Sequence, residues 1–120
     1  MAQTLPPALE QDLRKFDTMQ RNYETMAAKL QTWQMELNQV KATLEELNKQ
    51  PDDVVTYKNV GQILFKVDKP STVKDLADRE DVLEKTLESM KKKVESLAAN
   101  LKELQEKIQL ELSKHNLRLQ

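Results

Sequence analysis

Apolar residues recur every seven positions in the first half of the chain, in a segment that holds no proline or glycine after Pro7. They form two interleaved series: Leu9, Phe16, Tyr23, Leu30, Leu37 and Leu44, and Met19, Met26, Trp33, Val40 and Leu47. The offset between the series alternates between three and four residues, which is the spacing of a coiled-coil seam. Pro6 and Pro7 suit the first turn of a helix. The pattern therefore predicts one long helix over residues 8–50.

The same repeat returns in the second half of the chain. Its two series are Leu76, Leu83, Met90, Leu97 and Leu104, and Val73, Leu87, Val94, Leu101 and Ile108, the second interrupted by Glu80. Thr72, followed three residues later by Asp75, is a variant of the capping box and predicts where this helix starts. We therefore expect a second helix over residues 72–117. Near its end, Leu110 and Leu117 project to the side opposite the seam.

The stretch between these segments, VVTYKNVGQILFKVD at residues 54–68, has a strand-like composition and contains the only glycine of the chain, Gly61. Pro51 ends the helix before it. A type II′ turn requires glycine at its first central position, which predicts a β-hairpin with a two-residue turn at Gly61-Gln62. That turn would pair Val60 with Ile63, Lys58 with Phe65 and Thr56 with Val67.

Both faces of this predicted hairpin carry apolar residues. An isolated two-stranded hairpin is marginally stable in water, and two open edges favour pairing with further strands. We therefore expect the hairpin to lie in a sheet that several chains build together.

A hairpin reverses the chain, so the two helices are predicted to run antiparallel. Matching Leu47 to Leu76 brings Phe16 near Ile108. At about 1.5 Å per residue the helices would be roughly 60 Å long, and apolar residues would gather at the end remote from the hairpin. Two interpretations of this tip remain open: a site for apolar ligands, or a frayed helix end with an added coiled-coil contact.

Composition excludes several classes of function. The chain has 120 residues, no cysteine and a formal net charge of −1, which predicts one domain without disulfides or thiolate metal sites and disfavours nucleic acid as a partner. His115 is the only histidine and has no catalytic or metal-binding companions in the sequence. The triplet Lys91–Lys93 lies between Glu88 and Glu95, as expected of a solvated helix face. No secretory signal or membrane span is evident, so we expect a cytoplasmic protein without cofactors.

The helix–hairpin–helix order, with the segment YKNVGQILFKVDK at the hairpin, resembles the β-type subunit of prefoldin, and most of all an archaeal one. The resemblance covers nearly the whole chain, and the single hairpin indicates the β-type because the α-type subunit carries two. It implies an ATP-independent co-chaperone, a hexamer of two α-type and four β-type subunits. In that family the hairpins form a double β-barrel, and coiled-coil tips hold unfolded proteins and pass them to a group II chaperonin.

The resemblance assigns two sets of residues in this chain. The oligomerisation set is Val54, Val55, Tyr57, Val60, Gly61, Ile63, Leu64, Phe65 and Val67. The client-binding set rests on position and polarity, and comprises Leu5, Leu9, Leu13, Leu110, Leu112, Leu117 and Leu119. The alternative function is a structural coiled-coil scaffold or tether that the hairpin merely oligomerises.

Overall fold

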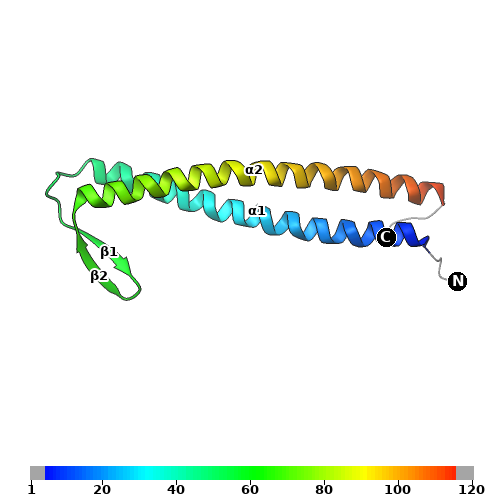
Figure 1. The fold of residues 1–120 in the computed structure, drawn as a ribbon, viewed down its shortest axis with the longest axis horizontal. Helices are drawn as coiled ribbons and strands as arrows, with labels where there is room; N and C mark the ends of the chain where they lie inside the picture. The colour runs from blue at the N-terminus through cyan, green and yellow to red at the C-terminus, as the bar shows by residue number, and fades with distance from the viewer. Residues whose placement is uncertain (1–4, 116–120) are drawn as a thin grey trace. The chain divides into compact units, whose positions relative to one another are not determined.

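The computed structural model describes residues 5–115. Its elements, in chain order, are α1 (Pro7–Asn48), β1 (Thr56–Val60), β2 (Ile63–Val67) and α2 (Lys69–Lys114), as Figure 1 shows. The predicted order of two long helices around one hairpin is confirmed. The described residues divide into two compact units, one built from 5–29 with 90–115 and the other from 30–89.

The ends of α1 follow from its prolines. The backbone N–H of Glu10 donates to the carbonyl of Pro6 at 3.0 Å, so the helix begins at Pro7, one position before the predicted start. At the other end the N–H groups of Lys49 and Gln50 donate to carbonyls only three residues back, at 3.2 and 3.1 Å. This tightened turn satisfies carbonyls that the helix leaves unpaired. The helix therefore ends at Asn48, and its predicted end at Gln50 falls within the turn.

The start of α2 differs from the prediction, because Asp68 and not Thr72 caps the helix. The Asp68 carboxylate accepts the N–H of Ser71 at 2.8 Å, and its carbonyl accepts the N–H of Thr72 at 3.2 Å. The hydroxyl of Thr72 also donates to that carbonyl, at 2.7 Å. The helix begins at Lys69, and Pro70 fits its first turn, where the missing N–H needs no partner. The predicted end at residue 117 lies outside the described residues.

This cap makes the start of α2 sensitive to acid. Hydrogen bonds from the backbone N–H and then the hydroxyl of Ser71 hold the pKa of Asp68 below its ordinary value. A lowered pKa in the folded state means that the cap stabilises above an aspartate's ordinary pKa of about 3.9, and that this contribution is lost as the pH falls through the lowered value. We expect Asp68→Asn, which keeps a capping oxygen but cannot titrate, to lose less thermal stability than the wild type between about pH 5 and pH 3. Equal losses in the two proteins would contradict this assignment.

The unit of residues 30–89 has its own core, in which the two helix segments pack side by side. The buried residues are Leu37, Val40, Leu44, Leu83 and Leu87. Two ion pairs flank this seam. The Arg79 guanidinium donates to Glu36 Oε1 at 2.6 and 2.9 Å, and Lys41 Nζ lies 3.3 Å from Glu84 Oε1. These contacts establish the antiparallel arrangement within this unit.

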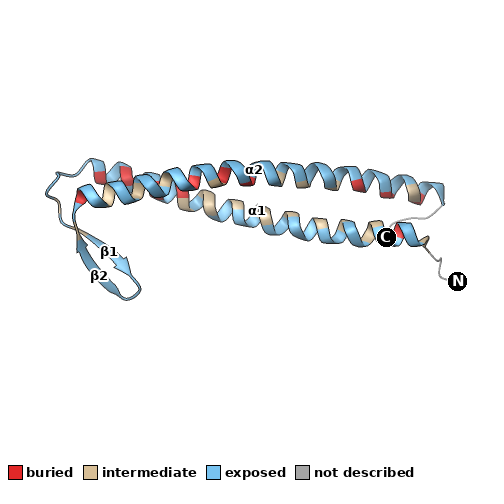
Figure 2. Cartoon of the chain, viewed as in Figure 1, coloured by how far each residue is buried: buried red, intermediate tan, exposed pale blue. Residues whose placement is uncertain are grey.

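The unit that contains both helix ends near the termini has a second core. Its buried residues are Leu9, Leu104, Ile108 and Leu112, with Leu5, Leu13, Phe16 and Met19 packed against them. The predicted neighbourhood of Phe16 and Ile108 is confirmed. Beside this core Lys107 Nζ lies 3.3 Å from Asp12 Oδ2. Figure 2 shows the buried residues spaced along both helices, as a heptad seam requires.

Candidate assembly and binding surfaces

The hairpin has the predicted register. β1 and β2 are antiparallel, with Val60 opposite Ile63, Lys58 opposite Phe65 and Thr56 opposite Val67. Gly61 has a φ of 59°, in the left-handed region that a type II′ turn needs at this position. A Cβ built on Gly61 would meet no atom within 4 Å. Glycine is therefore favoured here for its backbone conformation, not for space.

Both faces of the hairpin are exposed in the single chain, as the pale colour of β1 and β2 in Figure 2 shows. Large apolar side chains on the two strands and just before them are 51–64% exposed: Val55, Tyr57, Val60, Ile63, Leu64 and Phe65. Val54 and Val67, at the base of the hairpin, are half-buried. The structure thus brings the predicted oligomerisation residues together on one small element. A contiguous apolar surface of this kind is typical of an interaction site.

The edges of the hairpin are also open. Among the described residues the sheet consists of β1 and β2 alone. A two-residue turn makes Val60 and Ile63 a hydrogen-bonded pair, and such pairs alternate along an antiparallel ladder. The intervening residues, Tyr57 and Asn59 on β1 and Leu64 and Lys66 on β2, therefore point their N–H and C=O groups outward. These backbone groups can accept strands of other chains on either side.

Two apolar grooves lie where the hairpin meets the helices. One, of about 560 Å³, runs from Leu47 on α1 past Val54 and Val55 to Tyr57. The other, of about 280 Å³, lies between Tyr57, Val67 and Leu76 on α2. Tyr57 lines both grooves. The sequence pattern did not reveal them, since they depend on how the hairpin sits on the helices.

The structure divides the predicted client-binding residues by exposure. Leu9 and Leu112 are buried in the seam, and Leu5 and Leu13 are half-buried against it. Leu110 is 58% exposed, because a position two residues from Ile108 turns away from the seam. Leu117 and Leu119 lie outside the described residues. Among the described members of the client-binding set, Leu110 is the one that can contact a ligand while the two helices stay packed together.

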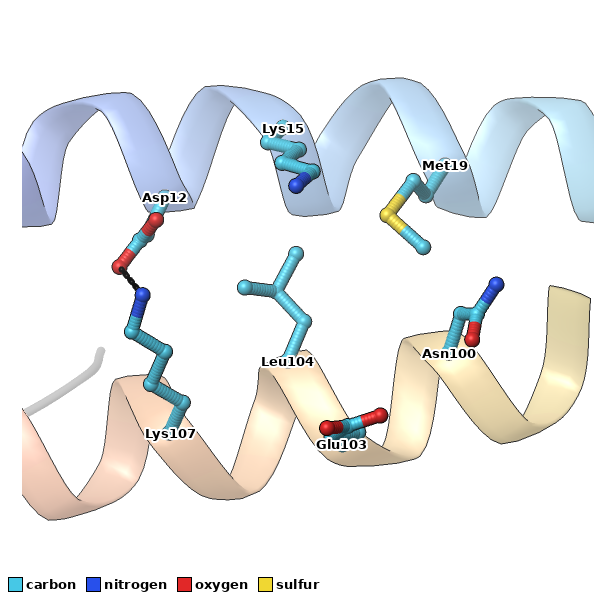
Figure 3. A pocket seen from close by; sticks show the side chains of 7 residues that line it. All are labelled: Asp12, Lys15, Met19, Asn100, Glu103, Leu104 and Lys107. Carbon is cyan, nitrogen blue, oxygen red and sulfur yellow. Dashed lines mark ion pairs between the residues drawn. The ribbon is translucent and has the colours of Figure 1, made fainter.

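A groove of about 530 Å³ lies between the helices close to this tip, and Figure 3 shows its lining. Leu104 and Met19 supply its apolar surface, while Asp12, Lys15, Glu103 and Lys107 surround it with two acids and two bases. Asp12 and Lys107 form an ion pair across the groove. Because these charges balance, the groove favours neither anionic nor cationic ligands, and we assign it no ligand.

The described residues contain no group of three side chains able to hold a metal ion. His115 is exposed, and its Nε2 lies 3.9 Å from Glu111 Oε2 on the same helix. Neither α1 nor α2 contains a stretch with the length and hydropathy of a membrane span.

A pair of long antiparallel helices that carries an uncovered β-hairpin defines a class of coiled-coil assembly subunits. Comparison with known proteins identifies the family within that class. The prefoldin subunit family model matches residues 10–115. The chain therefore belongs to the prefoldin family, a family of chaperone subunits and not of enzymes.

Relatives in archaea agree with this assignment and identify the type of subunit. The chain is 36% identical over 110 residues to the prefoldin subunit beta of Thermococcus gammatolerans, covering 92% of this chain and 94% of the relative. It is 34% identical to that of Methanosarcina acetivorans, covering 91% and 93%. The crystal structure of the prefoldin beta subunit from Thermococcus strain KS-1 superposes with a TM-score of 0.78 at 30% identity, covering 99% of this chain and 100% of that one. The predicted β-type resemblance is confirmed.

Proposed function

We propose that this chain is one subunit of an ATP-independent co-chaperone that captures unfolded proteins and delivers them to a group II chaperonin in the cytoplasm. Membership in the prefoldin family supports the chaperone role. The observation that supports assembly with other subunits is the hairpin, whose apolar faces and two edges are uncovered in the single chain. No cofactor is needed, since binding by apolar contact requires no chemistry.

The partners that this surface fits are other prefoldin subunits. Open strand edges and large apolar side chains on both faces are what a shared β-barrel needs from each contributor. We therefore propose that the hairpin joins those of other β-type copies and of an α-type partner, in a hexamer of two α-type and four β-type subunits. The oligomerisation residues named above would supply its apolar interior and its contacts with neighbouring chains.

Client capture is assigned to the tip, meaning the residues around the start of α1 and the end of α2. Leu110 is exposed there, and Leu117 shares its face in the heptad pattern. Apolar contact at one tip is weak and reversible. Several tips acting on one unfolded chain raise the overall affinity by effective concentration, without any new kind of contact.

The tip assignment predicts the behaviour of a double variant, Leu110→Ser with Leu117→Ser. Leu110 is exposed, and the heptad spacing predicts that Leu117 also lies off the seam, so the helices should remain paired while the apolar contact is lost. We expect the assembled complex to keep its mass but to suppress the aggregation of an unrelated unfolded protein several-fold less well. Leu112 is left intact because serine there would damage the buried core.

Val82→Ser is the matched control, because Val82 is an exposed apolar residue on the same helix outside the tip. It should leave suppression unchanged. Full suppression by the double variant would refute the tip assignment. The alternative, a structural scaffold or tether oligomerised by the hairpin, predicts a complex of the same mass whose wild-type form does not suppress aggregation at all.

A further inference from the structure

Lys69 is the buried charged residue of the described chain, with only 9% of its surface exposed. It is also the first residue of α2. A cation is unfavourable at the start of a helix, where the helix dipole is positive. Burial adds to that cost by removing water from the ammonium group. A lysine in this position therefore needs partners outside its own helix.

Those partners lie in the connection that follows α1. Lys69 Nζ donates to the carbonyl of Gln50 at 2.7 Å, and it lies 3.4 Å from Asp52 Oδ1. Gln50 lies in the turn that directly follows α1, so its carbonyl is close to the negative end of that helix's dipole. The ammonium is thus electrostatically unfavourable at the start of α2 but favourable near the end of α1. The pair with Asp52 is the weaker contact, because that side chain is 96% exposed.

The bond from Lys69 crosses between the two connections that join helices to strands. The first connection, residues 49–55, is mostly exposed, and a local turn from Val54 N–H to the Pro51 carbonyl at 3.0 Å shapes its middle. The second consists of Asp68, which caps α2. At the base of the hairpin the hydroxyl of Thr56 donates to the carbonyl of Val67 at 2.7 Å. Lys69 therefore links the connection after α1 to the start of α2, where the chain leaves the hairpin.

We propose that the Lys69 ammonium fixes the angle at which the hairpin leaves the helix pair, and that Lys69 is thereby a positioning residue for assembly. This inference rests on the proposed assembly through the hairpin. A hairpin held at one angle presents its edges and faces in one orientation to its neighbours. Such preorganisation lowers the entropy lost on association. Figure 1 shows the hairpin projecting from the helix ends at this junction.

The test removes the donor and keeps the side-chain stem. In Lys69→Met, spin labels on Gln62→Cys at the turn and Ala77→Cys on α2 report the hairpin angle, and the chain has no native cysteine to interfere. We expect a narrow distance distribution in the labelled wild type and a broad one in Lys69→Met. We also expect about a tenfold weaker association by sedimentation, with helical circular dichroism unchanged. Lys69→Arg, which restores a donor, should recover most of both signals.

Lys74→Met is the matched control, since it removes an exposed lysine from the same helix. It should alter neither the distance distribution nor association. An unchanged distribution in Lys69→Met would overturn the proposal, as would equal effects of the two methionine variants. Loss of the helical signal in Lys69→Met would also overturn it, because a positioning role leaves the helices folded. The distance measurement decides on Lys69 even if the wild type proves not to suppress aggregation, so the two failures can be told apart.

Discussion

Replacing Gly61 by valine should abolish assembly while the helices stay folded. The φ of 59° at this position is a conformation that a β-branched residue adopts poorly, at a cost of about 1–2 kcal/mol. About 1.4 kcal/mol changes an equilibrium constant tenfold. Because every copy carries the penalty, the association constant should fall by roughly tenfold for each copy of this chain in the complex. Sedimentation measures the association, and circular dichroism at 222 nm measures the helices.

Gly61→Asn is the control for this prediction. Asparagine tolerates a positive φ better than valine does, and a Cβ at this position meets no neighbouring atom within 4 Å. Assembly of Gly61→Asn should therefore be close to that of the wild type. If Gly61→Val assembled equally well, the turn would not control the assembly surface.

Replacing Leu83 by alanine should produce the largest loss of stability in the helix pair. Leu83 is only 2% exposed and lies in the core formed by the segments of residues 30–89. Truncating a buried leucine to alanine removes its apolar contacts and leaves a cavity, at a cost of about 2–5 kcal/mol. Chemical denaturation followed by circular dichroism measures this difference in the free energy of unfolding.

The neighbouring residue supplies the control for Leu83→Ala. Val82 is 52% exposed, so Val82→Ala changes the buried apolar surface only slightly. Surface substitutions of this kind usually change stability by less than about 0.5 kcal/mol. Similar losses in the two variants would contradict the assignment of Leu83 to the core and Val82 to the surface.

The periodic parts of this fold were predictable from sequence because each depends on local spacing. Heptads placed Leu37, Leu44 and Leu83 in a seam, and the single glycine fixed the turn and hence the whole register of the hairpin. The helix start at Lys69 was mispredicted, because the sequence Thr72-x-x-Asp75 matches a capping box although these residues do not cap the helix. In the folded chain Asp68, directly after β2, is already placed to cap.

The functional surfaces were predictable to different degrees. The hairpin surface follows from composition, since a two-stranded element with apolar residues on both faces cannot bury both faces by itself. At the tip, polarity alone grouped Leu9 and Leu112 with Leu110, whereas packing buries the first two and exposes the third. The contact of Lys69 with Gln50 joins residues on either side of the hairpin, and no local pattern marks it.

The central claim is that the hairpin is an assembly surface which a single chain cannot cover. Sedimentation of the purified chain at micromolar concentration, alone and with an α-type prefoldin subunit, tests this most directly. We predict that the chain alone does not remain a folded monomer, and that the mixture reaches the mass of two α-type and four β-type subunits. A chain that sediments as a folded monomer with an intact hairpin, and that does not bind the α-type subunit, would contradict this assignment of the hairpin.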